Sequence, residues 1–134
     1  MKVKKRSLEE IQFVSAPNRT IGEVYSGQTF GALGVTFRIV EMVPAAEQTP
    51  RRPHMHEDFE ELIHCLAGRG RVWSEGEWMD LNPGDTVLVP PGVMHATFNA
   101  SDAPLRLLCF FPRPEGVDAR VRADFTLTLN STEE

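Results

Sequence analysis

Two histidines separated by one residue are the first side chains in this sequence that could do chemistry together. His54 and His56 flank Met55, and on a β-strand residues two apart point to the same face, about 6.6 Å apart. Two imidazoles at that spacing can reach one metal ion at ~2.0–2.1 Å each. Glu61 follows five residues later, and a turn over 57–60 would return its carboxylate to the same ion. An isolated HxH pair is more often accidental, so this segment alone leaves both interpretations open.

A second segment, residues 83–99, supplies a third histidine. It alternates turns and strands, in the order turn at 83–85, strand at 86–89, turn at 90–92 and strand from His95. Glycine and proline mark both turns, and the intervening strand is rich in valine and other β-formers. Thr97 and Asn99 share the face of His95 because strand side chains alternate. This order places a metal-ligating side chain directly after a rigid turn.

Together the two segments resemble the cupin superfamily, whose two short motifs match here in residue type and spacing. The matching residues are His54, His56, Glu61 and Gly68 in the first motif, and Gly84, Pro90, Gly92, His95 and Asn99 in the second. Fifteen residues separate Gly68 from Gly84, a short spacing typical of small single-domain cupins. Gln48 departs from the pattern, since the first motif of the family begins with glycine. That position belongs to a turn, so the departure concerns the 43–53 loop and not the ligands.

The resemblance implies an all-β fold, the double-stranded β-helix or jelly roll, with one metal ion in the mouth of the barrel. The ligands it implies are His54, His56, Glu61 and His95. One divalent transition metal per chain is expected, and iron, manganese, nickel, zinc and copper all remain candidates because these ligands do not select among them. An octahedral ion would keep two positions for a chelating substrate, or for one substrate oxygen and dioxygen.

Length and composition predict one domain over residues 1–134, and the resemblance implies that it is a cupin domain. The chain has 10 glycines and 10 prolines, and the short β-rich runs between them are typical of a sandwich or barrel. We expect a core barrel over about 31–112, with segments 1–30 and 113–134 packed on it or on a dimer partner. Ser7-Leu8-Glu9-Glu10 fits a capping box and predicts one short N-terminal helix. Alternation over 121–129 predicts a terminal strand.

The walls of the barrel should determine the substrate. Strand parity points Ile63, Cys65, Thr97 and Phe111 inward, a largely apolar set. Arg38 could reach in to hold an anionic substrate, although an outward arginine on an alternating strand is the plainer interpretation. His64 has the opposite parity to Glu61 and should face away from the metal. With few acid–base groups inside, the metal centre itself is the expected chemical device, and no separate catalytic residue is predicted.

Charge and cysteine content bound the partners. The net charge of −5 argues against nucleic acid. The sequence also lacks the ~20-residue apolar stretch of a membrane span. We see no secretory signal, and Cys65 and Cys109 form no disulfide framework, so a cytoplasmic location is expected. The expected partners are a small-molecule substrate and a second copy of the chain in a homodimer.

The function predicted from these residues is that of a metal-dependent cupin enzyme acting on a small, oxygen-rich, chelating substrate. Dioxygenase-type chemistry is the first choice, and isomerase or lyase chemistry the second, because the fold does not decide among them. The alternative is a non-catalytic protein that uses the metal to bind a sugar or an acid. A full set of four ligands favours the enzyme, since cupins that only bind or store have often lost one.

Overall fold

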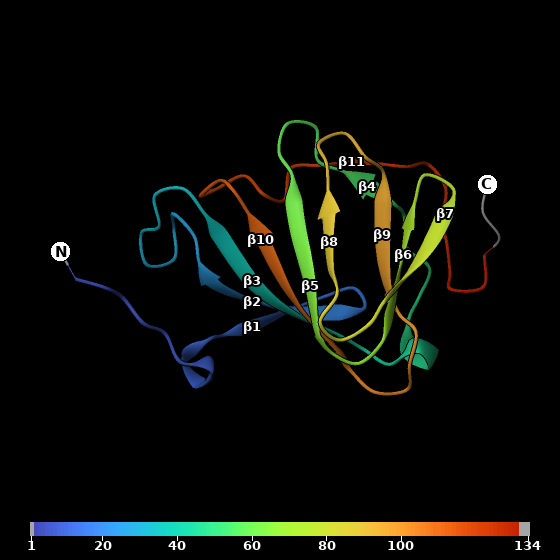
Figure 1. The fold of residues 1–134 in the computed structure, drawn as a ribbon, viewed down its shortest axis with the longest axis horizontal. Helices are drawn as coiled ribbons and strands as arrows, with labels where there is room; N and C mark the ends of the chain where they lie inside the picture. Colours follow the sequence, from blue (N-terminus) through green and yellow to red (C-terminus); the bar gives the residue numbers. More distant parts are fainter. Residues whose placement is uncertain (1, 132–134) are drawn as a thin grey trace.

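The computed structural model describes residues 2–131, and within them eleven strands form two antiparallel sheets packed face to face (Figure 1). The six-stranded sheet has the order β1 (Phe13–Ala16), β2 (Arg19–Tyr25), β3 (Thr36–Met42), β10 (Leu105–Phe111), β5 (Glu61–Ala67) and β8 (Thr86–Val89). The five-stranded sheet has the order β11 (Val121–Arg122), β4 (His54–Met55), β9 (His95–Asn99), β6 (Gly70–Ser74) and β7 (Glu77–Leu81). This is the predicted all-β jelly roll, in which strands near in sequence alternate between two sheets.

The core lies between the sheets, because each long strand alternates apolar residues inward. On β5, for example, Ile63 and Cys65 are buried while Leu62 and Leu66 are exposed. The buried side chains between the sheets are Val40, Met42, Phe59, Ile63, Cys65, Val72, Leu81, Val89, Leu105, Leu107, Cys109, Phe111 and Val117. Burying such side chains is worth roughly 1.5–3 kcal/mol each. This apolar layer therefore fixes the two sheets against each other and with them the side chains at the mouth of the barrel.

Both terminal segments pair with strands of the same chain. The predicted N-terminal helix is a single 3₁₀ turn, η1 (Leu8–Glu10), in which the Ser7 N–H donates to the Glu10 carboxylate at 3.0 Å. Strand β1 then pairs with β2 at the edge of the larger sheet. At the other end only β11 and a bridge between Arg51 and Leu127 form, so the strand predicted over 121–129 is much shorter than expected. Residue 1 and residues 132–134 of these segments lie outside the described residues.

The second small element, η2 (Ala45–Glu47), precedes the residue that departs from the cupin pattern. Gln48 has φ −77°, an ordinary extended conformation, so nothing in this turn requires glycine. The Gln48 side-chain amide donates to the Asn99 carbonyl at 2.9 Å and accepts from the Asn99 N–H at 2.7 Å. The glutamine therefore acts as a substitute strand partner, closing the 43–53 loop onto β9.

Asn99 is the structural centre of this corner. It is fully buried, and its amide donates to the carbonyls of Val43 and Ala103 at 3.0 and 2.7 Å while its oxygen accepts from the Ser101 N–H. Gly68, in the neighbouring turn, has φ +88°, and a Cβ there would lie 2.6 Å from the Pro104 carbonyl oxygen. Both residues therefore have structural roles. Asn99 satisfies buried backbone groups, and Gly68 allows the close approach of two chain segments.

Among residues 2–131 no helix is long and apolar enough to cross a membrane. Cys65 and Cys109 are both buried and both free.

The hydrogen bonds of Asn99 predict a large stability effect for Asn99→Ala. The substitution leaves several buried backbone groups without partners, so we expect the free energy of unfolding to fall by about 2–4 kcal/mol. Chemical denaturation measures this directly. The control is Asn82→Ala at an exposed turn, expected within about 0.5 kcal/mol of wild type. Equal effects in both variants would contradict the assigned role of Asn99.

Candidate metal centre

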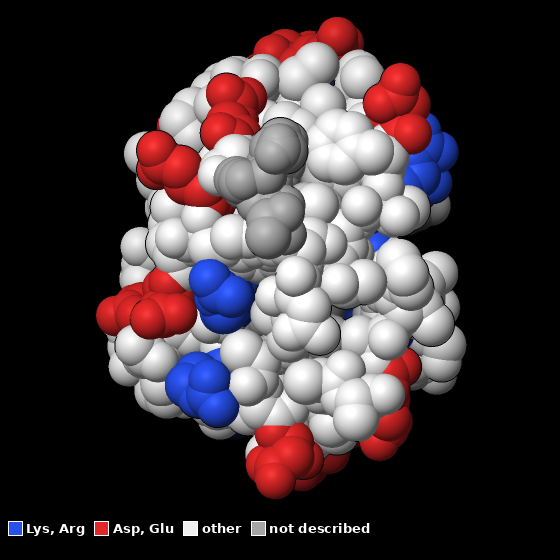
Figure 2. Space-filling view, turned by 90° about the vertical axis from the view of Figure 1, so that its right-hand side faces the viewer, with Lys and Arg blue, Asp and Glu red and all other residues white. Residues whose placement is uncertain are grey.

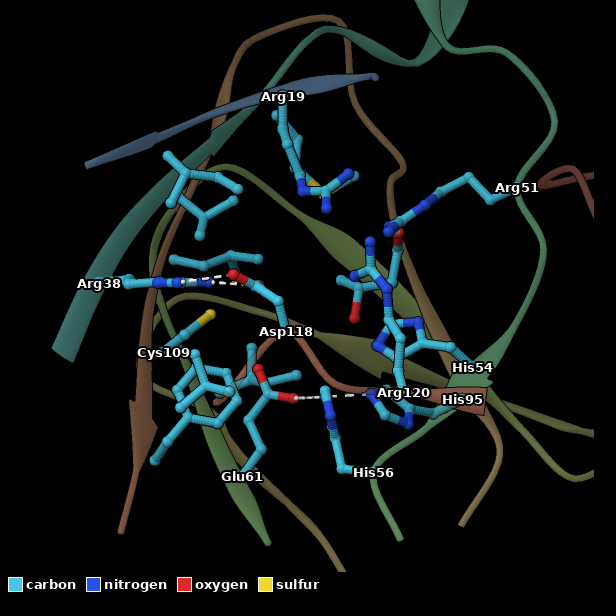
Figure 3. A pocket seen from close by; sticks show the side chains of 18 residues that line it. Arg19, Arg38, Arg51, His54, His56, Glu61, His95, Cys109, Asp118 and Arg120 are labelled. Atoms are coloured by element: carbon cyan, nitrogen blue, oxygen red, sulfur yellow. Dashed lines mark hydrogen bonds and ion pairs between the residues drawn. The ribbon is translucent and has the colours of Figure 1, made fainter. Parts of the chain in front are cut away.

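Four ionisable side chains from both sheets meet at one end of the barrel (Figure 3). His54 on β4 and His95 at the start of β9 are direct cross-strand partners, with ring centroids 4.5 Å apart. His56 follows β4 immediately, and its ring centroid lies 5.1 Å from that of His54. Glu61 opens β5 in the opposite sheet. The two motifs, far apart in sequence, therefore converge because β4 and β9 are neighbours and β5 faces them.

The donor atoms are close enough to share one cation. Nitrogen atoms of His54, His56 and His95 all lie within 4.8 Å of one another. The Glu61 Oε1 atom lies 3.6 Å from Nε2 of His56 and 3.6 Å from Nε2 of His95. Two atoms each bound at ~2.0–2.2 Å to one ion lie at most ~4.4 Å apart. Small ring rotations would therefore bring the three imidazoles to a single ion, and the Glu61 carboxylate lies beside two of them.

Backbone carbonyls orient two of the rings in the way a metal requires. Nδ1 of His56 lies 3.0 Å from the Ala119 carbonyl oxygen, and Nδ1 of His95 lies 3.0 Å from the Val93 carbonyl oxygen. A carbonyl can only accept, so each Nδ1 carries the proton and donates it. In the neutral form of either ring, the lone pair is therefore on Nε2, the atom that lies toward Glu61. Outer hydrogen bonds of this kind select the tautomer and raise the basicity of ligating histidines.

Burial and mutual contact set the protonation states. Burial by itself raises the pKa of Glu61, but His56 and His95 beside it lower that pKa to about 2. Burial, followed by the neighbouring His95 and His56, lowers the pKa of His54 to about 2. Burial also opposes protonation of His56, yet the Glu61 carboxylate and the Ala119 carbonyl hold its pKa above the ordinary value. Near neutral pH the site therefore holds Glu61 as a carboxylate anion beside a neutral His54 ring.

The loops that carry the ligands are tied together. The Gly92 N–H of the second motif donates to the His56 carbonyl at 2.7 Å, which joins the two motifs directly. The Phe59 ring lies 4.6 Å from the His56 ring and the Phe111 ring 5.8 Å from it, centroid to centroid. These aromatic walls restrict the imidazole to one orientation and shield this side from water.

A cavity opens from these side chains, and the structure shows where each predicted pocket residue lies. Arg38, Ile63, Thr97 and Phe111 line it. Cys65 does not; it is fully buried in the core, with Sγ near the Ala67 carbonyl. Its parity is inward as expected, but it lies two residues deeper along β5 than Ile63. His64 faces away from the ligands, and its Nδ1 lies 2.7 Å from the Thr86 hydroxyl.

Arg38 is inside the cavity but is already paired. Its guanidinium donates to the Glu23 carboxylate at 3.0 Å and to the Asp118 carboxylate at 2.9 Å. Burial alone would lower the pKa of Arg38, but Asp118 and Glu23 hold it above the ordinary value. The positive charge of Arg38 is therefore largely compensated by these two carboxylates.

The expectation of a largely apolar cavity is incomplete, because three further arginines line it. Arg19 begins β2, Arg51 precedes β4 and Arg120 precedes β11. Asp118 joins them from the same C-terminal segment as Arg120. No local motif marks these residues in the sequence. Arg19 and Arg120 reach the cavity from segments outside the two motifs, and Arg51 occupies a variable position of the first motif, before His54. The long-range pairing that brings them together is invisible in residue spacing.

The comparisons with known proteins agree with this geometry. The sequence model of the family described as Cupin domain matches residues 38–111. Quercetin 2,3-dioxygenase of Bacillus subtilis is 40% identical over 43 residues, which are 32% of this chain and 13% of that protein. Glucose-6-phosphate isomerase of Thermococcus gammatolerans is 33% identical over 70 residues, which are 48% of this chain and 37% of that protein.

A solved structure has the same fold at low sequence identity. Oxalate decarboxylase of Bacillus subtilis, studied for its Mn(II) centres, superposes on 86% of this chain and 30% of its own with a TM-score of 0.71 and 20% identity. The match confirms the jelly-roll architecture. The present chain spans less than two thirds of the length of the curated relatives it matches.

The convergence of the four side chains predicts a metal-binding phenotype. We expect His56→Ala and Glu61→Gln each to lower the affinity for a divalent transition metal by more than about 100-fold, since loss of even an outer partner typically costs 10–100-fold. Metal analysis by plasma mass spectrometry after dialysis against dilute chelator measures this. His64→Ala is the matched control and should keep wild-type metal content. Full metal retention in both ligand variants would contradict the assignment.

Proposed function

This chain belongs to the cupin family, and we propose that it is a metal-dependent enzyme acting on a small, oxygen-rich substrate that chelates the metal. One observation carries the proposal: three imidazoles and a carboxylate meet at the inner end of a cavity. We assign His54, His56, Glu61 and His95 as the ligands. The donor set suits a divalent transition metal, and Mn(II) in the structural neighbour makes manganese one candidate beside iron, nickel, zinc and copper.

The proposed ion would polarise substrate oxygen atoms or bring substrate and dioxygen together. The chain's own residues hold and orient what binds. Phe111 and Ile63 form an apolar wall, while Thr97 offers a hydroxyl on the strand that carries His95. Exclusion of water by such walls strengthens every electrostatic interaction inside the cavity.

The remaining titratable groups of the cavity are poor general bases, and this favours oxygenase-type chemistry as the first choice. Arg38 lowers the pKa of Asp118, so that carboxylate holds protons weakly. Burial, and then the charge of Glu61, raises the pKa of Cys109 well above its ordinary value, so the thiol stays neutral. Efficient acid–base catalysis needs a group with a pKa near the working pH. A reaction that depends on chelation rather than on a separate base fits these walls better.

Isomerase or lyase chemistry is the second choice. The similarity to glucose-6-phosphate isomerases extends over 70 residues, longer than the match to the dioxygenase. Oxalate decarboxylase shares the fold. All three activities belong to proteins longer than this chain, so none is transferred whole. What they share is a small substrate rich in oxygen, and that is the class proposed here.

The alternative is a non-catalytic protein that uses the metal to bind a sugar or an acid. The absence of a well-placed base among the described cavity residues keeps this alternative open. Binding without turnover in every metal form would be its signature.

We further propose that residues 1–134 form a single cupin domain, with its core barrel over about 31–112, and that it acts as a homodimer in a reducing, cytoplasmic setting. The outer face of β5 and β8 exposes Leu62, Leu66 and Leu88, a row of apolar side chains that a second copy could cover. The face on the side of β7 is different, because Figure 2 shows separate acidic and basic residues scattered around its edge. Sedimentation velocity measures the oligomeric state directly.

The experiment for the function is a metal-by-substrate matrix. Apoprotein is loaded separately with Fe(II), Mn(II), Ni(II), Zn(II) and Cu(II). Each form receives a catechol or flavonol, a sugar phosphate, and oxalate or a 2-oxo acid, with oxygen uptake and NMR as readouts. We expect turnover in at least one cell of the matrix and its loss in Glu61→Gln, with His64→Ala unchanged. If ligands bind in the matrix but none is turned over, the enzyme proposal is contradicted and the alternative of a non-catalytic binding protein is supported.

A further inference from the structure

Three arginines that pair with no carboxylate of residues 2–131 lie together in the wall of the cavity. Arg19, Arg51 and Arg120, here called the arginine cluster, come from three separate segments. Figure 3 shows their guanidinium groups pointing toward one another and into the cavity. The same three residues, together with His54, also line a second hollow that adjoins the first. The cluster and His54 therefore lie between the two hollows.

No carboxylate of the described residues binds the cluster directly, although the charges of Asp118 and Glu61 act on it from farther away. Among residues 2–131 no carboxylate forms an ion pair with Arg19, Arg51 or Arg120. Arg19 donates to the Pro17 carbonyl at 2.8 Å and Arg51 donates to the Thr97 carbonyl. A carbonyl accepts a hydrogen bond but cancels no charge. Arg38 differs, because Glu23 and Asp118 already hold it.

The arginines also repel one another. Burial, followed by the charges of Arg19 and Arg120, lowers the pKa of Arg51 to about 10. Burial and then Arg120 lower the pKa of Arg19. The whole chain carries a net charge of −5, so this local excess of positive charge runs against the overall balance. A half-buried group of like charges is costly unless an anion compensates it.

We propose that the arginine cluster binds an oxyanion, a carboxylate or a phosphate, at one end of a substrate whose other end reaches His54, His56, Glu61 and His95. Guanidinium groups offer paired N–H donors that match both oxyanions. The inference deepens the proposed function by making the substrate anionic: an organic acid or a phosphate ester with a separate chelating oxygen pair. Contact between the other end of the substrate and the metal ligands rests on the proposed function, whereas anion binding by the arginine cluster does not.

The test uses apoprotein, so anion binding is measured without the metal. Inorganic phosphate and malonate are titrated separately by calorimetry, and the two arms distinguish a phosphate site from a carboxylate site. We expect one site per chain for at least one of them. Arg120→Gln should weaken it by about 10-fold or more, as loss of one charge-assisted hydrogen bond does. The Arg120 side chain makes no hydrogen bond or ion pair within residues 2–131, so its replacement removes no contact of this kind from the fold.

The matched control is Arg71→Gln. Arg71 lies on β6, pairs with Asp80 and stacks over Trp78, outside the cavity. It should leave anion binding unchanged, while Arg120→Lys should restore part of the affinity. Absence of binding by both anions in the wild type, or equal binding in Arg120→Gln and wild type, overturns the inference.

Metal content of the same variants separates the two proposals. We expect Arg120→Gln to keep its metal, because the cluster is distinct from the ligands. If the wild type binds phosphate or malonate through Arg120 but takes up no metal, the proposed function fails and the anion site stands. If metal binds through His56 and Glu61 but no anion binds, the anion site fails alone.

Discussion

The buried carboxylate of Glu61 is the constraint on which the rest of the site depends. It is 7% exposed and lies between the two sheets, 3.6 Å from imidazoles of His56 and His95. An unpaired carboxylate at such a position would be strongly destabilising, because its charge has lost most of its water. The imidazoles, or a cation shared with them, must supply the compensation. This one requirement explains why β4, β9 and β5 bring their first residues to the same point, and why backbone carbonyls orient the rings.

Charge is separated along the cavity. The Glu61 carboxylate lies among imidazoles on one side of the cavity, called the inner end, and the guanidinium groups of the arginine cluster lie on the other side, called the outer end. Between them are apolar walls with a neutral thiol and a tightly paired Arg38. Such a field favours a small molecule that is negative at the outer end and offers neutral or anionic oxygen atoms to a cation at the inner end. Under the proposed function, the distribution of charge in the walls would position the substrate.

The sequence predicts that the side chains of the two motifs converge, but it does not predict the arginine cluster. His54, His56, Glu61 and His95 are identifiable because strand alternation and glycine–proline turns determine their direction over short distances. Gln48 could not be interpreted from its residue type, since its role depends on the backbone of Asn99, fifty-one residues away. The arginine cluster is unpredictable for the same reason. The prediction of a strand over 121–129 is wrong in its extent. Apolar side chains of this segment pack on the outer face of β6 and β9, and most of its backbone pairs with no strand.

The most direct measurement is anomalous diffraction from crystals of the protein loaded with Mn(II) or Co(II). The account predicts one strong peak per chain, about 2.0–2.3 Å from a nitrogen of each of the three histidines and from a carboxylate oxygen of Glu61. Ions found only elsewhere on the chain, with the four side chains keeping their metal-free separations at saturating metal, would contradict it.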